Sequence, residues 1–252
     1  LRRILFLIIK QTHNARKKYV SQNQPDLNFF KANTGISNHT YMISGSGVDT
    51  RYFCNSQYYP NDKLVVLMFC RMLHSKGVFE YLESVKKLDK SLRERTEFIL
   101  LGGSFPFNPN KIDKEWLAGS DSIDPVSLLS ETRMAKVKWF EHDNDILKYI
   151  KKSDVVVLPT YYPEGLPRSL LEAMSCNNII ITTNQPGCRD VVDGSNGFLV
   201  EPRDVEQLYI ALKKCIEMSK TDIQKMQQRS RDLVIQKFSD EIVIKKYKKI
   251  YF

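Results

Sequence analysis

The chain has 252 residues, of which 42% are hydrophobic and 27% charged, a composition typical of a globular domain with enough apolar material for a core. The formal net charge of +9 favours anionic partners such as phosphates, nucleic acid or anionic lipid. The apolar run at residues 4–9 is far shorter than the roughly 20 residues that cross a bilayer and too short for a signal-peptide core with its cleavage site, so we expect a cytoplasmic protein.

Neither the cysteines nor the histidines have the spacing of a site. The five cysteines form no Cys-x-x-Cys pair, and the four histidines are scattered. We therefore expect free thiols in a reducing compartment and no bound metal.

The first 52 residues contain only short elements. Residues 1–18 predict an amphipathic helix that ends in a basic cluster at 16–18. Short strands are expected at 19–21 and 39–44, with a short helix at 26–32 between them. Residues 45–49, GSGVD, are interpreted as a plain turn, because this Gly-x-Gly lacks a third glycine and a following helix.

Beyond a linker at residues 53–62, strands and helices alternate. The expected strands are nearly continuous apolar runs, at 63–70, 97–101, 135–140, 155–158, 178–182 and 198–200. Helices are expected at 78–88, at 145–152, from Pro167 onward and at 188–192, and two long amphipathic helices follow the last strand. Residues 104–123 are interpreted as an insertion. This alternation predicts an α/β fold with a Rossmann-like, doubly wound parallel sheet.

Residues 154–176, DVVVLPTYYPEGLPRSLLEAMSC, have the most informative pattern. A strand buried on both faces leads through a loop into a helix with Pro167 at its first position, an arrangement that presents free backbone N–H groups to an anion. Glu164 in the loop and Glu172 in the helix are spaced as E-x7-E, and we expect both to face the cleft beyond the strand.

Cations are expected at the same edge. Arg71 and Lys76 follow the strand at 63–70, and a leaving diphosphate needs such charges. The alternative is that both are surface charges at a helix start, although cations there oppose the helix dipole. Arg168 likewise either pairs with Glu172 at i,i+4 or contacts a negative ligand.

The two glutamates allow two interpretations. A carboxylate pair can be the acid and nucleophile of a glycosidase, but hydrolysis does not call for a phosphate-binding edge. Carboxylates also accept hydrogen bonds from sugar hydroxyls, and one near a hexose with one near a ribose would fit a sugar nucleotide.

Six motifs in order resemble the donor half of the family 4 retaining glycosyltransferases, which have the GT-B fold. The motifs are Arg71-x4-Lys76-Gly77, Gly102-Gly103, Pro163-Glu164-Gly165-Leu166-Pro167-Arg168, Leu171-Glu172-Ala173-Met174, Gln185-Pro186-Gly187-Cys188-Arg189 and Asp193-Gly194-x-Asn196-Gly197. EGLPRSLLEAM followed by PGCRD is similar to bacterial enzymes that build capsule, O-antigen or lipid-linked oligosaccharides.

The resemblance implies a role for each matching position. Arg71 and Lys76 would bind the donor diphosphate, Glu164 the transferred sugar and Glu172 the ribose. The backbone N–H groups of Gly165 and Leu166 would contact the phosphate and the sugar, and Arg168 and Gly103 would also contact the donor. The loops after Gly103 and near 141–143 would recognise the nucleotide base. Asn177 and Asn178 stand where the family usually has Gly-x-Pro, and we expect the turn to survive because Asn tolerates left-handed geometry.

The implied protein is a retaining glycosyltransferase of cell-surface polysaccharide synthesis. It would move a hexose from a nucleoside-diphosphate sugar, expected to be a UDP-sugar, to a glycan or lipid-linked acceptor, without a cofactor. Residues 1–52 would be the tail of a truncated N-terminal acceptor domain, residues 63–237 the donor domain, and residues 238–252 a helix that packs back toward the first domain. The alternative is a truncated, non-catalytic nucleotide-sugar-binding protein.

The basic C-terminal end also has two interpretations. Lysines at 245, 246, 248 and 249 alternate with tyrosines and an isoleucine. They form either a solvated helix face or a peripheral contact with the inner face of an anionic membrane. At such a surface each lysine adds about 1 kcal/mol to the free energy of membrane binding. We expect no nucleic-acid partner, because no recognition motif accompanies the charge.

Overall fold

The computed structural model describes residues 2–55, 62–103, 121–141 and 143–252. Most of the expected insertion, including the loop after Gly103, lies outside these residues, as does part of the linker.

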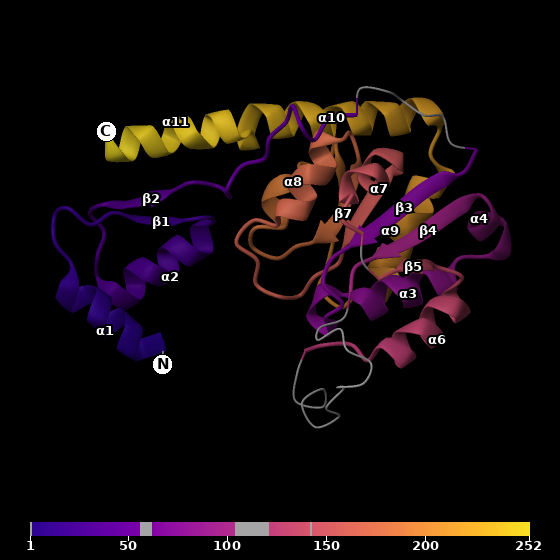
Figure 1. Ribbon diagram of the computed structural model, residues 1–252, viewed down its shortest axis with the longest axis horizontal. Coiled ribbons are helices and arrows are strands. Elements are labelled where there is room, and N and C mark those ends of the chain that lie inside the picture. Colours follow the sequence, from indigo (N-terminus) through magenta and orange to yellow (C-terminus); the bar gives the residue numbers. More distant parts are fainter. Residues whose placement is uncertain (1, 56–61, 104–120, 142) are drawn as a thin grey trace.

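A six-stranded parallel sheet forms the centre of the molecule (Figure 1). Its strands lie in the order β5-β4-β3-β6-β7-β8, and every neighbouring pair is parallel. Their bounds are β3 Leu64–Phe69, β4 Thr96–Leu101, β5 Lys138–Phe140, β6 Val155–Leu158, β7 Ile179–Thr183 and β8 Gly197–Val200. The doubly wound α/β prediction is therefore confirmed.

Helices cover both faces of this sheet. The first face carries α3 (Val78–Lys87), α6 (Pro125–Ala135) and α9 (Val205–Glu217), and the second carries α7 (Ile146–Lys152), α8 (Arg168–Ser175) and α10 (Lys220–Phe238). Alternate residues of one strand enter the two cores: Val66 packs with the first set of helices and Val65 with the second. Burial on both faces explains why the strands are continuous apolar runs.

The N-terminal residues form a separate small layer, seen beside the main sheet in Figure 1. It contains α1 (Arg2–Thr12), β1 (Tyr19–Ser21), α2 (Gln24–Thr34) and β2 (Thr40–Met42), and its two strands are parallel. The last helix, α11 (Asp240–Tyr251), continues from α10 and runs alongside this layer. Lys18 Nζ lies 5.3 Å from the centroid of the Tyr251 ring, so the N-terminal layer contacts α11.

Three details differ from the sequence-based expectation. The first helix ends at Thr12, which leaves the basic cluster at 16–18 outside it. The strand expected from Ala135 begins at Lys138, because Ala135 closes α6 and Lys136 ends that helix in the left-handed conformation with φ 57°. Pro167 is the N-cap of α8 and not its first helical residue.

Two helices were not expected at all. These are α6 and the short α4 (Lys90–Glu94), and each begins at an aspartate whose side chain accepts a backbone N–H three residues on. Two 3-10 turns complete the described elements, η1 at His74–Lys76 and η2 at Arg189–Val191. The left-handed turn expected after α8 is confirmed, since Asn177 has φ 64°. No helix among the described residues is long and apolar enough to cross a membrane.

Candidate functional site

The candidate site lies where the strand order reverses. The strands β3 and β6 are neighbours although β4 and β5 lie between them in sequence, so the chain leaves their carboxyl ends in opposite directions. Doubly wound folds bind ligands in the crevice outside the carboxyl ends at this topological switch point. The loop after β3 and the loop after β6, which carry most of the expected site residues, therefore lie at the position that the fold favours for a ligand.

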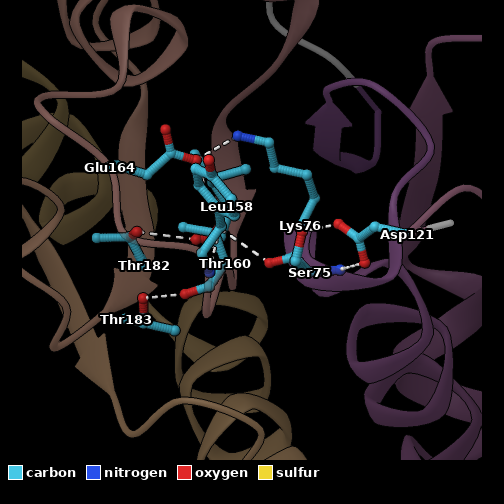
Figure 2. A network of polar contacts seen from close by, with 9 residues as sticks. Ser75, Lys76, Asp121, Leu158, Thr160, Glu164, Thr182 and Thr183 are labelled. Atoms are coloured by element: carbon cyan, nitrogen blue, oxygen red, sulfur yellow. Dashed lines mark hydrogen bonds and ion pairs between the residues drawn. The ribbon is translucent and has the colours of Figure 1, made fainter. Parts of the chain in front are cut away.

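Backbone and hydroxyl hydrogen bonds join these two loops (Figure 2). The carbonyl of Ser75 accepts hydrogen bonds from Thr160 Oγ1 at 3.0 Å and from the backbone N–H of Tyr161 at 2.9 Å. Gly77 ends the first loop with φ 81°, and a Cβ added there would lie 2.2 Å from the carbonyl oxygen of Pro159. Only glycine allows both this backbone conformation and this close approach.

Lys76 and Glu164 form an ion pair across the two loops (Figure 2). Their side chains are 14% and 16% exposed, so both are mostly withdrawn from solvent while an edge stays accessible. Thr160 Oγ1 lies 3.4 Å from the same carboxylate oxygen, and the ring of Tyr162 lies 5.8 Å from the ammonium. The sequence predicted that the two residues share an edge, and the structure brings them into direct contact.

Asp121 supports the lysine loop from outside the expected motifs. Its carboxylate accepts the backbone N–H of Ser75 at 3.0 Å and also the Ser75 hydroxyl, and its carbonyl accepts the N–H of His74 at 2.8 Å. Sequence reasoning missed this residue because it stands at the end of the expected insertion, with no motif around it. By capping the turn His74–Lys76, Asp121 fixes the backbone from which Lys76 extends.

Arg168 and Glu172 form the i,i+4 ion pair that the sequence left open as one alternative, with Arg168 Nε 3.0 Å from Glu172 Oε1. The Glu172 side chain is only 15% exposed, whereas that of Arg168 is 65% exposed. Burial raises the pKa of the Glu172 carboxyl, and the nearby guanidinium opposes this shift. Contact of either residue with a ligand stays a prediction.

The other expected cation and glycine also lie at this edge. The Arg71 side chain is exposed and has no hydrogen-bond or ion-pair partner within the described part of the chain. Gly103 accepts the N–H of Met72 at 3.2 Å, which places the Gly102-Gly103 turn beside the loop after β3. A Cβ on Gly102 would lie 1.9 Å from the carbonyl oxygen of Cys70, so this approach too requires glycine.

The loop at Gly165 and Leu166 presents unused donors. Neither backbone N–H has a hydrogen-bond acceptor among the residues that the structure describes. Gly187, from the motif at 185–189, lies against this loop with φ 83°, and a Cβ there would be 2.1 Å from the carbonyl oxygen of Gly165. Contact of these two amides with a phosphate or sugar, which the family resemblance implies, stays a prediction.

The thiols near the site have no evident part in its chemistry. All five cysteines are free, as expected from their spacing. Burial raises the pKa of Cys70, at the end of β3, to about 12, so this thiol stays protonated at neutral pH. The described residues contain no group of three or more His, Cys, Asp or Glu side chains placed to hold a metal ion.

Comparison with known proteins gives matches over most of the chain. Residues 55–232 match the family model described as glycosyl transferases group 1. The N,N'-diacetylbacillosaminyl-diphospho-undecaprenol alpha-1,3-N-acetylgalactosaminyltransferase of Campylobacter jejuni is 26% identical over 190 residues, which are 75% of this chain and 44% of that protein. The capsular polysaccharide biosynthesis glycosyltransferase CapM of Staphylococcus aureus is 25% identical over 223 residues, which are 88% of this chain and 53% of CapM.

Among solved structures, Anabaena Alr3699/HepE in complex with UDP superposes with a TM-score of 0.80 and 17% identity, over 99% of this chain and 67% of that one. An identity this low shows a shared fold alone. The chain spans about half the length of the curated relatives named here.

Proposed function

Because the chain belongs to the glycosyl transferases group 1 family and has the α/β fold of GT-B glycosyltransferases, we propose that it is a hexosyltransferase. It would move a hexose from a nucleoside-diphosphate sugar to a glycan or lipid-linked acceptor in cell-surface polysaccharide synthesis, with retention of the anomeric configuration. The curated relatives support this class of reaction, since one is a transferase for a diphospho-undecaprenol acceptor and another a capsular polysaccharide enzyme.

The observation that carries the proposal is the paired Lys76 and Glu164 at the switch point. A diphosphate sugar brings an anion and a set of hydroxyls to one place, and this pair offers one group for each. The diphosphate would take Lys76 together with the exposed Arg71, and the freed Glu164 carboxylate would accept hydrogen bonds from the sugar. Glu172 would bind the ribose hydroxyls, with Arg168 beside it.

The reaction follows from where charge develops. The bond between the sugar C1 and the diphosphate oxygen breaks, and the acceptor oxygen bonds to C1 on the same face. The acceptor proton passes to an oxygen of the leaving diphosphate. The negative charge of the leaving group is stabilised by Arg71, Lys76 and the amides of the 165–166 loop, since preorganised donors aimed at developing charge lower the barrier. These cations neutralise the diphosphate, so we propose no metal or cofactor for this step.

The donor base and the membrane contact are also proposals. A uridine nucleotide is favoured because HepE, which shares the fold, has been solved with UDP. Contact with an anionic membrane surface is favoured by α11, where Lys245, Lys246, Lys248 and Lys249 are all exposed while Val243 on the opposite face is buried. A lipid-linked acceptor would be met at such a surface.

Thermal unfolding with a panel of nucleoside diphosphates and their sugars tests the proposal. A donor at 100 times its Kd stabilises the folded chain by about 2.7 kcal/mol, which raises the Tm by roughly 5–11 °C for a protein of this size. Lys76→Ala should remove most of this shift and lower the transfer rate by at least about 100-fold. Lys87→Ala is the matched control, because Lys87 pairs with Glu206 on the surface.

Near-normal donor binding and turnover by Lys76→Ala would refute the assignment. Donor binding by the unmodified protein without any transfer would instead favour the non-catalytic binding protein.

A further inference from the structure

We propose that Asn23, in the N-terminal layer, is a positioning residue that aims the amides of Gly165 and Leu166 at the donor phosphate. The inference rests on the proposed function for the identity of the ligand, but its structural content does not depend on it. Asn23 is 1% exposed and lies more than 140 residues from this loop in sequence.

The Asn23 side chain joins α2 to the loop. Its Nδ2 lies 3.2 Å from the carbonyl oxygen of Gly165 and 3.4 Å from that of Glu164. The same nitrogen donates to Asp26 Oδ2 at 2.8 Å. An amide nitrogen has two hydrogens, so one hydrogen serves Asp26 and the other is shared between the two loop carbonyls, a three-centre arrangement.

The orientation of this amide is fixed by the helix that it caps. Asn23 is the N-cap of α2, and its Oδ1 accepts the backbone N–H of Asp26 at 2.8 Å. The oxygen must therefore face the helix and the NH2 group must face the loop. The helix cap and the loop contact use opposite ends of one amide, so α2 cannot keep its cap with the amide reversed.

Holding the carbonyls determines where the N–H groups point. In a trans peptide the C=O and the N–H lie in one plane and point in opposite directions. The carbonyl of Glu164 shares its peptide with the N–H of Gly165, and the carbonyl of Gly165 shares its peptide with the N–H of Leu166. Asn23 engages both carbonyls, so both amides point away from α2, where they have no acceptor among the described residues.

Two glycines make this arrangement tight. A Cβ on Gly187 would lie 2.1 Å from the Gly165 carbonyl oxygen and 2.8 Å from that of Glu164. A Cβ on Gly165 itself would lie 2.3 Å from Gln22 Oε1, the residue before Asn23. Gly187 and the Gln22–Asn23 turn therefore lie against these peptides, and the hydrogen bonds from Asn23 hold both carbonyls on the α2 side. Loss of these hydrogen bonds removes that constraint and should change the orientation of the two peptides.

The test uses variants that keep the helix cap. Serine caps α2 as well as asparagine does but cannot reach the loop, and Asn23→Asp keeps the acceptor and the shape but has no NH2 group. Gln24→Ala is the matched control, since Gln24 is exposed and, among the residues that the structure describes, its side chain bonds only to Asn28. In ligand-free protein, we expect Asn23→Ser and Asn23→Asp to shift the backbone amide resonances of Gly165 and Leu166, with α2 resonances beyond the cap unchanged.

Titration of the same samples with UDP provides the second measurement. We expect the Kd for UDP to rise about 5-fold to 10-fold in both Asn23 variants, the effect of one shared hydrogen bond, and to stay unchanged in Gln24→Ala. Unshifted Gly165 and Leu166 resonances, or an unchanged Kd, would overturn the positioning role. If the unmodified protein binds no nucleoside diphosphate, the proposed function fails, while the resonances alone still decide whether Asn23 orients the loop.

Discussion

Replacing Gly77 with alanine tests whether the two loops of the site are held together by close backbone contact. Gly77 has φ 81°, and the added Cβ would lie 2.2 Å from the carbonyl oxygen of Pro159. Real Cβ contacts essentially never fall below 3.0 Å, so the loops would have to separate by at least about 0.8 Å. Lys76 and Glu164 stand on these two loops and would be drawn apart.

The cost has two parts. A non-glycine residue in the left-handed conformation loses about 1–2 kcal/mol, and forcing extra volume into a packed contact costs about 1–3 kcal/mol. The free energy of unfolding should therefore fall by about 2–5 kcal/mol, a large share of the roughly 5–15 kcal/mol of a typical domain. At about 2–4 °C per kcal/mol, the Tm should fall by about 4–20 °C.

Gly194→Ala separates the two parts. Gly194 has φ 84°, but an added Cβ there has no atom within 4 Å, so this variant carries the conformational cost without the clash. Thermal and urea unfolding of both variants should show Gly77→Ala to be less stable than Gly194→Ala by about 1–3 kcal/mol. Equal losses in the two variants would show that the loops do not approach as the structure has them.

Two further predictions concern charge. Burial raises the pKa of Glu172 above its ordinary value of 4.5, so the folded protein holds this proton more tightly than the unfolded chain, and stability falls as pH rises through that window. Glu172→Gln cannot ionise and does not have this loss. In urea unfolding, the free energy of unfolding of the variant minus that of the unmodified protein should therefore be larger at pH 7 than at pH 4. A difference that does not depend on pH would contradict the burial argument. For the membrane proposal, the protein should sediment with anionic phospholipid vesicles and not with neutral ones, and replacing Lys245, Lys246, Lys248 and Lys249 with glutamine should abolish this; equal binding to both kinds of vesicle would refute it.

The sequence predicts well what depends on local pattern. The run at 155–158 is apolar throughout and β-branched at its three valines, and β6 has those bounds. Placing Lys76 and Glu164 at one edge needed only the rule that parallel strands end on the same side. The helix α6 was not predicted although its start has a local signal. Asp124 followed by Pro125 is typical of a helix N-terminus, and Asp124 is the N-cap.

What could not be predicted depends on contacts between distant segments. The pairing of Lys76 with Glu164 requires the hydrogen bonds that Ser75 accepts from the second loop. Asp121, at the end of the expected insertion, contacts Ser75 in the loop after β3. Asn23 contacts Gly165, which lies 142 residues away in sequence. No local pattern marks either of these contacts, because the partners are fixed by the folded backbone and not by neighbouring sequence.

The strand order also determines when the site can form during synthesis. The strands β4 and β5 can pair on one side of β3 as soon as they are made, but the opposite edge of β3 waits for β6, and Val66 pairs with Val155. Until residue 158 has left the ribosome, a hydrophobic central strand therefore has an open edge that can pair with another chain. Pairing of β6 with β3 covers this edge and places the loop of Glu164 beside that of Lys76, so a nascent chain halted before β6 has no site and is prone to aggregate.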